Sequence, residues 1–393
     1  MMSFQHYFGE THCMIRETAA KFVEKEISPH IDEWEECGEF PHDLYRKAGE
    51  IGLLGIGYPE ELGGSGGDVF QKLVWTEELM RAGSGGLTAG LGSLDIGLPP
   101  LVKFGSEALK QRIVPAVLSG EKIYALAITE ASGGSDVAKL RTRAVRETSE
   151  DGKEYYRVNG SKTFITSGVR ADYYTVAVRT GGKGYCGVSL LMIEKGAKGF
   201  SVGKPLKKMG WWVSDTAELF FEDCLVPVEN LIGEENQGFK LITSNFQSER
   251  LTLAVMANMT SELALQACLD YVKERQAFDK PLAGHQTIRH KLADMATQLE
   301  VSREFTYRCA ARINAGDQIH KEISMAKNFA TDASDKITYD AVQIFGGMGY
   351  MRESLVERLF RDNRILSIGG GTREIMNEII SKQMGLCIPY LLR

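Results

Sequence analysis

At residues 153–168 the sequence reads KEYYRVNGSKTFITSG, and here the spacing of the apolar residues changes from a helical period to a period of two. The Asn159-Gly160 pair between two such runs predicts a β-hairpin with a tight turn. Several short strands within about 100 residues are typical of a small barrel or sandwich, so residues 122–228 are predicted to form a middle β domain. Its further strands are predicted at 172–180, 187–195 and 216–227.

The sequence on either side of this segment has helical periodicity. The apolar residues of 14–27 recur on one helical face, and residues 1–121 are predicted to form an N-terminal helical domain. Consecutive long helices favour an antiparallel bundle. We therefore expect an α+β chain that ends in a C-terminal four-helix bundle over residues 229–393. The long helices are predicted at 253–278, 286–315 and 321–345, with a last one after the glycines at 369–371.

Composition narrows the functional class. The net charge is −6 and the basic residues are scattered, which argues against a nucleic-acid-binding protein. No apolar run approaches the ~18 residues expected of a membrane-spanning helix. The first residues include acids and no cleavable apolar core, so we expect a cytoplasmic protein. The seven cysteines are dispersed and no H-E-x-x-H occurs, so neither disulfides nor a metal site is predicted.

A run of three glycines opens the last predicted helix, in the segment LSIGGGTREIM at residues 366–376. Thr372 can cap that helix through its hydroxyl. Glycine permits unusual backbone conformations and lets a ligand approach the main chain closely. The absence of side chains at Gly369, Gly370 and Gly371 therefore indicates that a ligand comes close to this turn.

Two segments of the middle domain can border a cofactor, although each also has an ordinary structural explanation. The loop in AITEASGGSDVAKLRTRA, residues 127–144, can hold a phosphate or a flat heterocycle with its N–H groups and hydroxyls, or it is a solvated hairpin loop. Phe164 and Thr166 share one strand face and can border a ring or belong to the core. No G-x-G-x-x-G or Walker A motif occurs, so a nicotinamide Rossmann domain or P-loop is not predicted.

Three helix ends carry further candidates. Arg275, Phe278 and Gln286 combine a guanidinium with an aromatic ring, which suits a nucleotide, although such helix ends are usually solvated. The glycines of QIFGGMGY, residues 343–350, can form a binding turn or only a helix C-cap. Glu249, beside an apolar stripe, can be a tuned general base. The ordinary interpretation of Glu249 is an exposed first-turn acid that favours the helix dipole.

Six segments occur in the order and with the approximate gaps of the acyl-CoA dehydrogenase family, which the chain resembles over nearly its whole length. Each motif alone is loose, but six in order are highly specific. The resemblance implies an N-terminal helical domain, a middle β domain and a C-terminal four-helix bundle, as in the division above. The segments are AITEASGGSD, GSKTFITSG, KKMGWWVSDTAELFFEDCLVP, KERQAFDKPLAGHQ, QIFGGMGYMRE and IGGGTREIM.

The resemblance also implies FAD as the cofactor and the removal of two hydrogens from the Cα–Cβ bond of an acyl-CoA thioester. Many members have Trp at the position of Phe164, and a Phe there preserves stacking but alters the flavin edge. By position, the flavin ring would be lined by Ile128, Thr129, Phe164 and Thr166, with Ser135 near the phosphates or the CoA and with Thr372 and Glu374 on the glycine-turn side. The FAD of a neighbouring subunit, in the homotetramer usual for the family, would be reached by Arg275, Phe278, Gln286, Gln343, Gly346 and Gly347.

The resemblance is closest to a minority of the family in the placement of the catalytic base. Most members carry the catalytic glutamate one residue before the Gly-Thr pair of this turn, where the present chain has Gly370. The isovaleryl-CoA and long-chain acyl-CoA dehydrogenases instead place the base on the first long helix of the bundle, in an E-R-L setting. Because this chain has Glu249, Arg250 and Leu251 in that setting, Glu249 is predicted to abstract the α-proton.

The family chemistry assigns the remaining roles. The backbone N–H at Gly370 and a ribityl hydroxyl of FAD would bind the thioester oxygen, with Arg250 and Gly369 also adjoining the substrate. Hydride would leave Cβ for flavin N5, and an electron-transfer flavoprotein would accept the electrons. Because the loss of bulk at Gly369 and Gly370 should widen the acyl cavity, we expect a medium-to-long or methyl-branched acyl chain.

Two other functions stay open from the sequence. The first is a flavin-dependent oxidase or monooxygenase on the same fold, acting on a substrate that is not a CoA thioester. The second is a homologue that binds flavin or acyl-CoA without turnover. The missing glutamate at position 370 favours this second function, and the presence of Glu249 argues against it.

Overall fold

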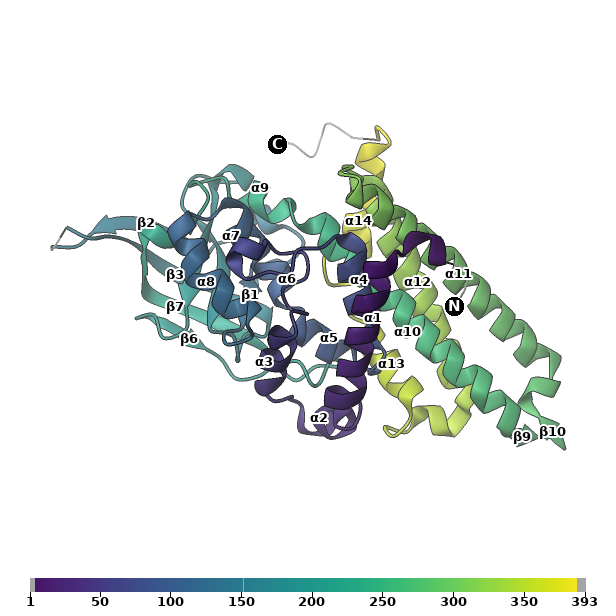
Figure 1. Cartoon of the computed structure of the whole chain (residues 1–393). Coiled ribbons are helices and arrows are strands. Elements are labelled where there is room, and N and C mark those ends of the chain that lie inside the picture. The colour runs from purple at the N-terminus through teal and green to yellow at the C-terminus, as the bar shows by residue number, and fades with distance from the viewer. Residues whose placement is uncertain (1–3, 151, 387–393) are drawn as a thin grey trace.

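The structure is a computed structural model that describes residues 4–150 and 152–386. Its elements fall into a helical region, a mixed sheet and a second helical region in chain order, as predicted. In Figure 1 the sheet lies at one side and the long C-terminal helices at the other, with N-terminal helices packed on both. In the described part of the chain, none of the helices combines the length and the apolar character that a bilayer crossing requires.

The N-terminal region is built of short helices that contact both other regions. Helix α4 (Val69–Met80) packs on the C-terminal helices, whereas α6 (Leu94–Gly97) packs on the sheet. Helix α4 begins with a capping box, in which the Asp68 carboxylate accepts from the N–H of Gln71 and the Gln71 side chain accepts from the N–H of Asp68. The other helices are α1 (Glu10–Phe22), continued by a π-helical turn at Val23–Ile27, α2 (Ile31–Cys37), α3 (Asp43–Glu50), α5 (Gly85–Leu91), α7 (Pro99–Phe104) and α8 (Glu107–Leu118).

The middle region is a single mixed sheet. Among the described residues, eight strands share one hydrogen-bonded network in the order β6-β7-β3-β2-β4-β5-β8, with β1 paired in parallel to β4. The strands predicted at 172–180, 187–195 and 216–227 are confirmed as β4, β5 and β7. The strands are β1 (Tyr124–Ala127), β2 (Arg143–Thr148), β3 (Glu154–Thr166), β4 (Tyr173–Arg179), β5 (Val188–Glu194), β6 (Phe200–Val202), β7 (Thr216–Pro227) and β8 (Leu231–Ile232).

The predicted hairpin at Asn159-Gly160 is wrong, because the residues on both sides of this pair belong to one strand. Strand β3 is continuous and pairs with β2 on one side and with β7 on the other. Its register against β7 shifts between Val158 and Gly160, which is the mark of a β-bulge. Gly160 has φ of 144°, and an added Cβ would lie 2.7 Å from Thr142 Cα. The Asn-Gly pair therefore marks a bulge that needs glycine, not a chain reversal.

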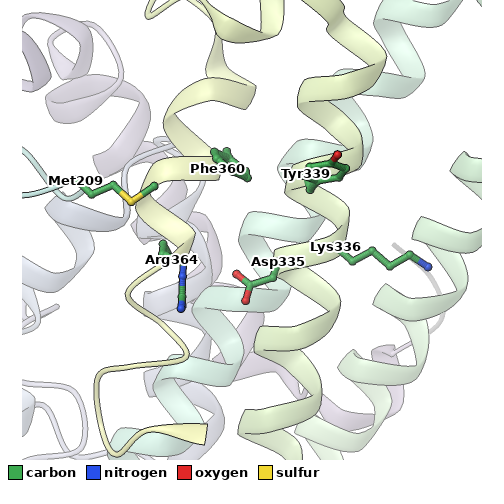
Figure 2. Close-up of a pocket in the computed structure, with 6 residues that line it drawn as sticks. All are labelled: Met209, Asp335, Lys336, Tyr339, Phe360 and Arg364. Atoms are coloured by element: carbon green, nitrogen blue, oxygen red, sulfur yellow. The ribbon is translucent and has the colours of Figure 1, made fainter.

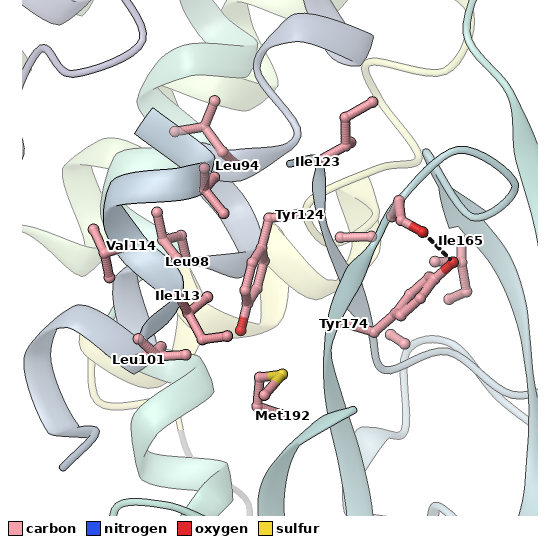
Figure 3. Close-up of a cluster of buried hydrophobic side chains, with 14 of the residues drawn as sticks. Leu94, Leu98, Leu101, Ile113, Val114, Ile123, Tyr124, Ile165, Tyr174 and Met192 are labelled. Carbon is pink, nitrogen blue, oxygen red and sulfur yellow. Dashed lines mark hydrogen bonds between the residues drawn. The ribbon is translucent and has the colours of Figure 1, made fainter. Parts of the chain in front are cut away.

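A buried cluster fixes the N-terminal helices to the sheet, as Figure 3 shows in part. Tyr124 of β1 is fully buried, and its hydroxyl lies 2.8 Å from Thr175 Oγ1, which donates to the Gly97 carbonyl at 2.9 Å. An added Cβ at Gly97 would lie 2.9 Å from the Ala125 carbonyl, so this glycine lets α6 pack directly on β1. The helix side chains that pack in this cluster include Leu94, Leu98, Leu101, Ile113 and Val114.

The C-terminal region contains the predicted long helices. The first of them, α10, begins at Phe246, seven residues before the predicted start at 253, so it includes Glu249 in its first turn. Asn258 of α10 donates to Thr306 at 3.0 Å, which joins it to the next helix within the apolar interior. The helices are α9 (Gly238–Thr243), α10 (Phe246–Glu274), α11 (Gln286–Asn314), α12 (His320–Phe345), α13 (Leu355–Asn363) and α14 (Arg373–Gln383).

One buried charge cluster joins the three regions. The Asp362 carboxylate on α13 accepts from the main-chain N–H of Gly85 at 3.1 Å and of Trp211 at 2.6 Å. Arg361 donates to Glu35 of α2 at 3.1 Å, and all three charged side chains are buried. Burial and the nearby Glu35 raise the pKa of Asp362 to about 7, and Arg361 opposes this shift. The guanidinium of Arg361 is therefore the main compensation for two buried carboxyl groups.

Replacing Arg361 by methionine should lower the stability of the folded chain by ~3–5 kcal/mol, because it removes the positive charge that compensates two buried carboxyl groups. The loss should be smaller at about pH 5.5 than at about pH 8, since Asp362 with its raised pKa takes up a proton between these values. Thermal unfolding at both pH values measures the effect. As a control, Arg146→Met breaks an exposed pair with Glu154 and should change the melting temperature little. Equal losses for the two variants would contradict the prediction.

Candidate active site

The glycine turn lies directly against the first turn of α10. Gly370 has φ of 63°, and a Cβ added there would lie 3.3 Å from Oε1 of Glu249 and would overlap the Leu253 side chain. Two side chains of α10 therefore fill the space in which a side chain at position 370 would begin. The structure brings together the two residues, Glu249 and Gly370, that the sequence analysis predicted at the catalytic position.

The surroundings of Glu249 tune its basicity. Its side chain is partly buried, and the loss of hydration raises its pKa. The positive charges of Arg250 and Lys327 act in the opposite direction. The outcome is a carboxyl group whose pKa is above the ordinary value while two cations lie near it, which is an arrangement suited to proton transfer.

Lys327 of α12 is a site residue that the sequence analysis missed. It is 1% exposed, and its ammonium donates to the carbonyl oxygens of Gly369 at 2.6 Å and Gly371 at 2.5 Å. Burial lowers its pKa to about 8, and Glu249 acts in the opposite direction. The signal in the sequence is a single lysine within the apolar helical run ISMAKNFAT at residues 323–331, where a buried charge needs a partner.

Arg250 lies next to Glu249 and is 4% exposed. Its guanidinium lies over the Phe246 ring, 5.1 Å from the centroid. Among the described residues its Nε has no hydrogen-bond partner. A buried guanidinium with an unused donor is costly unless a ligand satisfies it, so this side chain fits its predicted place beside a substrate.

Four predicted flavin-binding residues of the middle region lie on adjoining segments. Thr129 accepts at its carbonyl from the N–H of Thr163 at 2.9 Å, which places Ile128 and Thr129 beside the end of β3 that carries Phe164 and Thr166. Phe164 has φ of 59° and is 68% exposed, although this backbone conformation is strained for an aromatic residue. Strain of this kind, kept at an exposed ring, indicates a functional role such as stacking.

A buried ion pair fixes the base of the polar loop that follows. Lys162 donates to Glu130 at 2.8 Å and to the Ile128 carbonyl at 3.0 Å, while Glu130 also accepts from the N–H of Arg141 and Thr142. Burial lowers the pKa of Lys162 to about 8, and Glu130 opposes the shift. The loop is thereby anchored at its start and its end, while residues 131–136 between them stay exposed.

The exposed part of this loop fits a cofactor phosphate. Ser135 is exposed, and no described atom lies within 4 Å of a Cβ added at Gly133, so the main chain is open to a ligand. N–H groups and a hydroxyl in an open loop suit a phosphate, and the exposed Phe164 ring suits a flat heterocycle. The residues present therefore fit a flavin nucleotide. Of the residues predicted on the glycine-turn side, Thr372 caps α14 by accepting from the N–H of Ile375 at 3.4 Å, and Glu374 is exposed in the first turn of α14.

A second set of predicted residues lies at the far end of the bundle. Phe278 and Asp279 form the turn between β9 (Gln276–Ala277) and β10 (Lys280–Pro281), and Figure 1 places these strands at the end of α10 and α11 remote from the sheet. Both turn residues have positive φ, of 54° and 59°, and Phe278 is 90% exposed. Within one chain this second set does not lie beside the first set, which is formed by the predicted flavin-binding residues of the middle region. At this end the Phe345 ring of α12 stacks on the Tyr271 ring of α10, with the ring centroids 4.1 Å apart. The second set consists of these exposed residues: Arg275, Phe278, Gln286, Gln343, Gly346 and Gly347.

A separate hollow of about 410 Å³ lies over α12 and α13. Figure 2 shows Asp335 and Tyr339 on α12 facing Phe360 on α13 and Arg364 directly after α13, with Met209 at the rim. Burial raises the pKa of Asp335. No residue predicted for catalysis or cofactor binding lines this hollow, so it is distinct from the site at the glycine turn.

Of the two glycines that were expected to widen the acyl cavity, Gly370 leaves no additional space. At Gly370 the space is filled by Glu249 and Leu253, so the absent side chain leaves no room there. At Gly369 an added Cβ would meet only the Ile365 carbonyl, at 3.5 Å, among the described atoms. Space for an acyl chain can therefore be gained at Gly369 but not at Gly370.

Models of known protein families match all three regions of this chain. Models of the acyl-CoA dehydrogenase N-terminal, middle and C-terminal domains match residues 9–121, 125–224 and 236–385. An acyl-CoA dehydrogenase of Bacillus subtilis (strain 168) is 41% identical over 94% of this chain and 97% of its own length. The mitochondrial long-chain specific acyl-CoA dehydrogenase of Sus scrofa is 38% identical over 98% of this chain and 88% of its own length.

Solved structures agree with these matches. A probable acyl CoA dehydrogenase from Mycobacterium abscessus superposes with a TM-score of 0.93 at 53% identity, over 96% of this chain and 100% of that one. An acyl-CoA dehydrogenase complexed with FAD from Bacillus anthracis has a TM-score of 0.89 at 32% identity, over 96% of this chain and 67% of that one. The chain therefore belongs to the acyl-CoA dehydrogenase family of FAD-dependent oxidoreductases.

Proposed function

We propose that this chain catalyses the α,β-dehydrogenation of an acyl-CoA thioester to the trans-2-enoyl-CoA, with Glu249 as the base that takes the α-proton. The observation that carries this proposal is that the Glu249 carboxylate lies where a side chain at Gly370 would begin, 3.3 Å from an added Cβ, and in most of the family this position carries the glutamate. A base supplied by α10 explains why position 370 carries no side chain. The raised pKa of Glu249 supports the same role, because a carboxylate that burial has desolvated is a stronger base.

The main-chain N–H of Gly370 is the donor that we assign to the thioester oxygen. As the α-proton moves to Glu249, negative charge moves toward that oxygen, and a fixed donor stabilises it. Bound FAD supplies the hydride acceptor for Cβ. Phe164 and Thr129 would hold the flavin ring from the middle region, and Thr372 and Glu374 at the start of α14 would also hold it, so that the substrate is positioned between base and acceptor.

The second residue set supports a proposal about assembly. Arg275, Phe278 and Gln286 are exposed and remote from the first set, so they can hold FAD only when another copy of the chain brings its own cofactor to them. We therefore place each FAD between two subunits, in the homotetramer that the family resemblance implies. An electron-transfer flavoprotein is the proposed electron acceptor, on the same resemblance.

Substitution of Glu249 by glutamine should abolish proton abstraction while keeping the shape of the site. We expect a yellow protein with unchanged FAD content whose turnover is lower by ~10²-fold or more. Flavin absorbance and steady-state rates with an artificial electron acceptor measure the two properties. The matched control is Glu300→Gln on the exposed surface of α11, which should turn over normally. Near-normal turnover of Glu249→Gln would refute the assignment.

Arg275→Ala should weaken retention of FAD, because it removes a guanidinium from the edge that we assign to the neighbouring subunit's cofactor. The expected result is a lower ratio of flavin to protein after gel filtration, together with altered assembly. Lys273→Ala, which removes another exposed cation two residues earlier, serves as the control and should retain FAD. Full flavin content in both variants would contradict the intersubunit role.

Anaerobic titration of the yellow protein with acyl-CoAs from C4 to C16, isovaleryl-CoA and citronellyl-CoA should bleach the flavin. Because only Gly369 leaves room for the acyl chain, we expect medium-to-long or methyl-branched thioesters to react better than short straight ones. Much faster bleaching by short straight chains would overturn the substrate class. A fully loaded protein that no thioester bleaches would favour an oxidase or a non-catalytic homologue, and oxygen consumption would separate these two.

A further inference from the structure

We infer that Lys327 is a positioning residue of the reaction, acting on the thioester oxygen through the Gly369–Gly370 peptide. This inference rests on the proposed function, because it needs the Gly370 N–H to face the thioester. The ammonium of Lys327 donates to the Gly369 carbonyl at 2.6 Å and to the Gly371 carbonyl at 2.5 Å. It therefore bridges the peptide unit that precedes Gly370 and the one that follows Gly371.

The geometry of a peptide unit makes this contact relevant to catalysis. In a trans peptide the carbonyl and the N–H point in opposite directions. An ammonium bound at the carbonyl oxygen of Gly369 therefore lies behind the N–H of Gly370 and polarises it, since hydrogen bonds in a chain strengthen one another. A stronger donor at Gly370 stabilises the negative charge that develops on the thioester oxygen.

The bridge also fixes the conformation of the turn. Gly370 has φ of 63° and no side chain that could hold its orientation, so the direction of its N–H depends on the Gly369–Gly370 peptide unit. Lys327 holds this unit, and the unit that follows Gly371, from a helix that is packed in the core of the bundle. Without the ammonium, two carbonyl groups would lose a charge-assisted hydrogen bond, and the turn could rotate away from the substrate.

The charges near Lys327 are those of the reaction centre. Among the described residues, the groups that shift its pKa are Glu249 and Arg250 of α10, while the segment before α14 presents carbonyl oxygens to it. In the resting site the two cations, Lys327 and Arg250, face the carboxylate of Glu249. When Glu249 takes the proton, the cations remain, and the substrate then carries the negative charge that they stabilise.

The test compares Lys327→Met and Lys327→Arg with Lys291→Met, which removes another lysine of the bundle, paired with Asp340 at 2.5 Å. We expect Lys327→Met to retain FAD and to lose about 10-fold or more in kcat with a small change in KM, as for weakening of an oxyanion donor. Lys327→Arg keeps a charge that does not titrate, so its activity should persist above about pH 8, where the wild-type lysine loses its proton. Lys291→Met should lose stability only.

A direct readout of charge stabilisation is the α-deprotonation of 3-thiaoctanoyl-CoA, whose sulfur blocks hydride transfer. The resulting anion gives a charge-transfer band with oxidised flavin, and the band should appear at higher pH in Lys327→Met than in the wild type. Equal band formation in Lys327→Met and Lys291→Met would overturn the inference alone. If Lys327→Met does not fold, a wild-type pH profile in Lys327→Arg would overturn it. Failure of the wild-type protein to bleach with any acyl-CoA would instead overturn the proposed function, and this inference with it.

Discussion

The close packing of the Gly370 turn on α10 is the constraint on which the rest of the site depends. The space beside Gly370 holds the Glu249 carboxylate and Leu253, so a side chain at position 370 and the present side chains of α10 exclude each other. The turn has no side chain that could take a proton, so in the proposed mechanism Glu249 of α10 supplies this group. Because the turn itself offers only main-chain groups, the proposed mechanism divides the two tasks of the reaction: the Glu249 side chain takes the proton, and the Gly370 N–H binds the thioester oxygen.

The same packing sets the electrostatics. Glu249 is placed where burial raises its pKa, and the positive charges of Arg250 and Lys327 act against that shift. Arg250 contributes to this balance without an Nε partner among the described residues, whereas Lys327 donates to two main-chain carbonyls. One cation is thus left available to a ligand, and the other holds the turn.

The sequence predicted what depends on local patterns and on the order of motifs. The three-part order, strands β4, β5 and β7 and the long helices followed from periodicity, and the pairing of Glu249 with Gly370 followed from family motifs. The domain limits 1–121, 122–228 and 229–393 remain proposals. What failed depended on distant partners: the Asn159-Gly160 pair is a bulge because β7 pairs alongside it. The start of α10 was not predicted because its first turns contain polar residues, which the sequence pattern does not mark as buried. Gln247 is one of these, and in the fold it accepts a hydrogen bond from the distant N–H of Ile319.

Three lysines hold loop backbone in the same way, and of these Lys162 and Lys327 are buried while Lys208 is partly buried. Lys162 holds the Ile128 carbonyl, Lys208 holds the Ser214 carbonyl, and Lys327 holds those of the glycine turn. Burial lowers the pKa of each to about 8. A lysine whose pKa is lower in the folded than in the unfolded chain costs stability at neutral pH, and this cost falls as the pH rises above 8. Such lysines do not serve overall stability. Each fixes loop backbone, and two of the three loops are those that we assign to the flavin and the thioester.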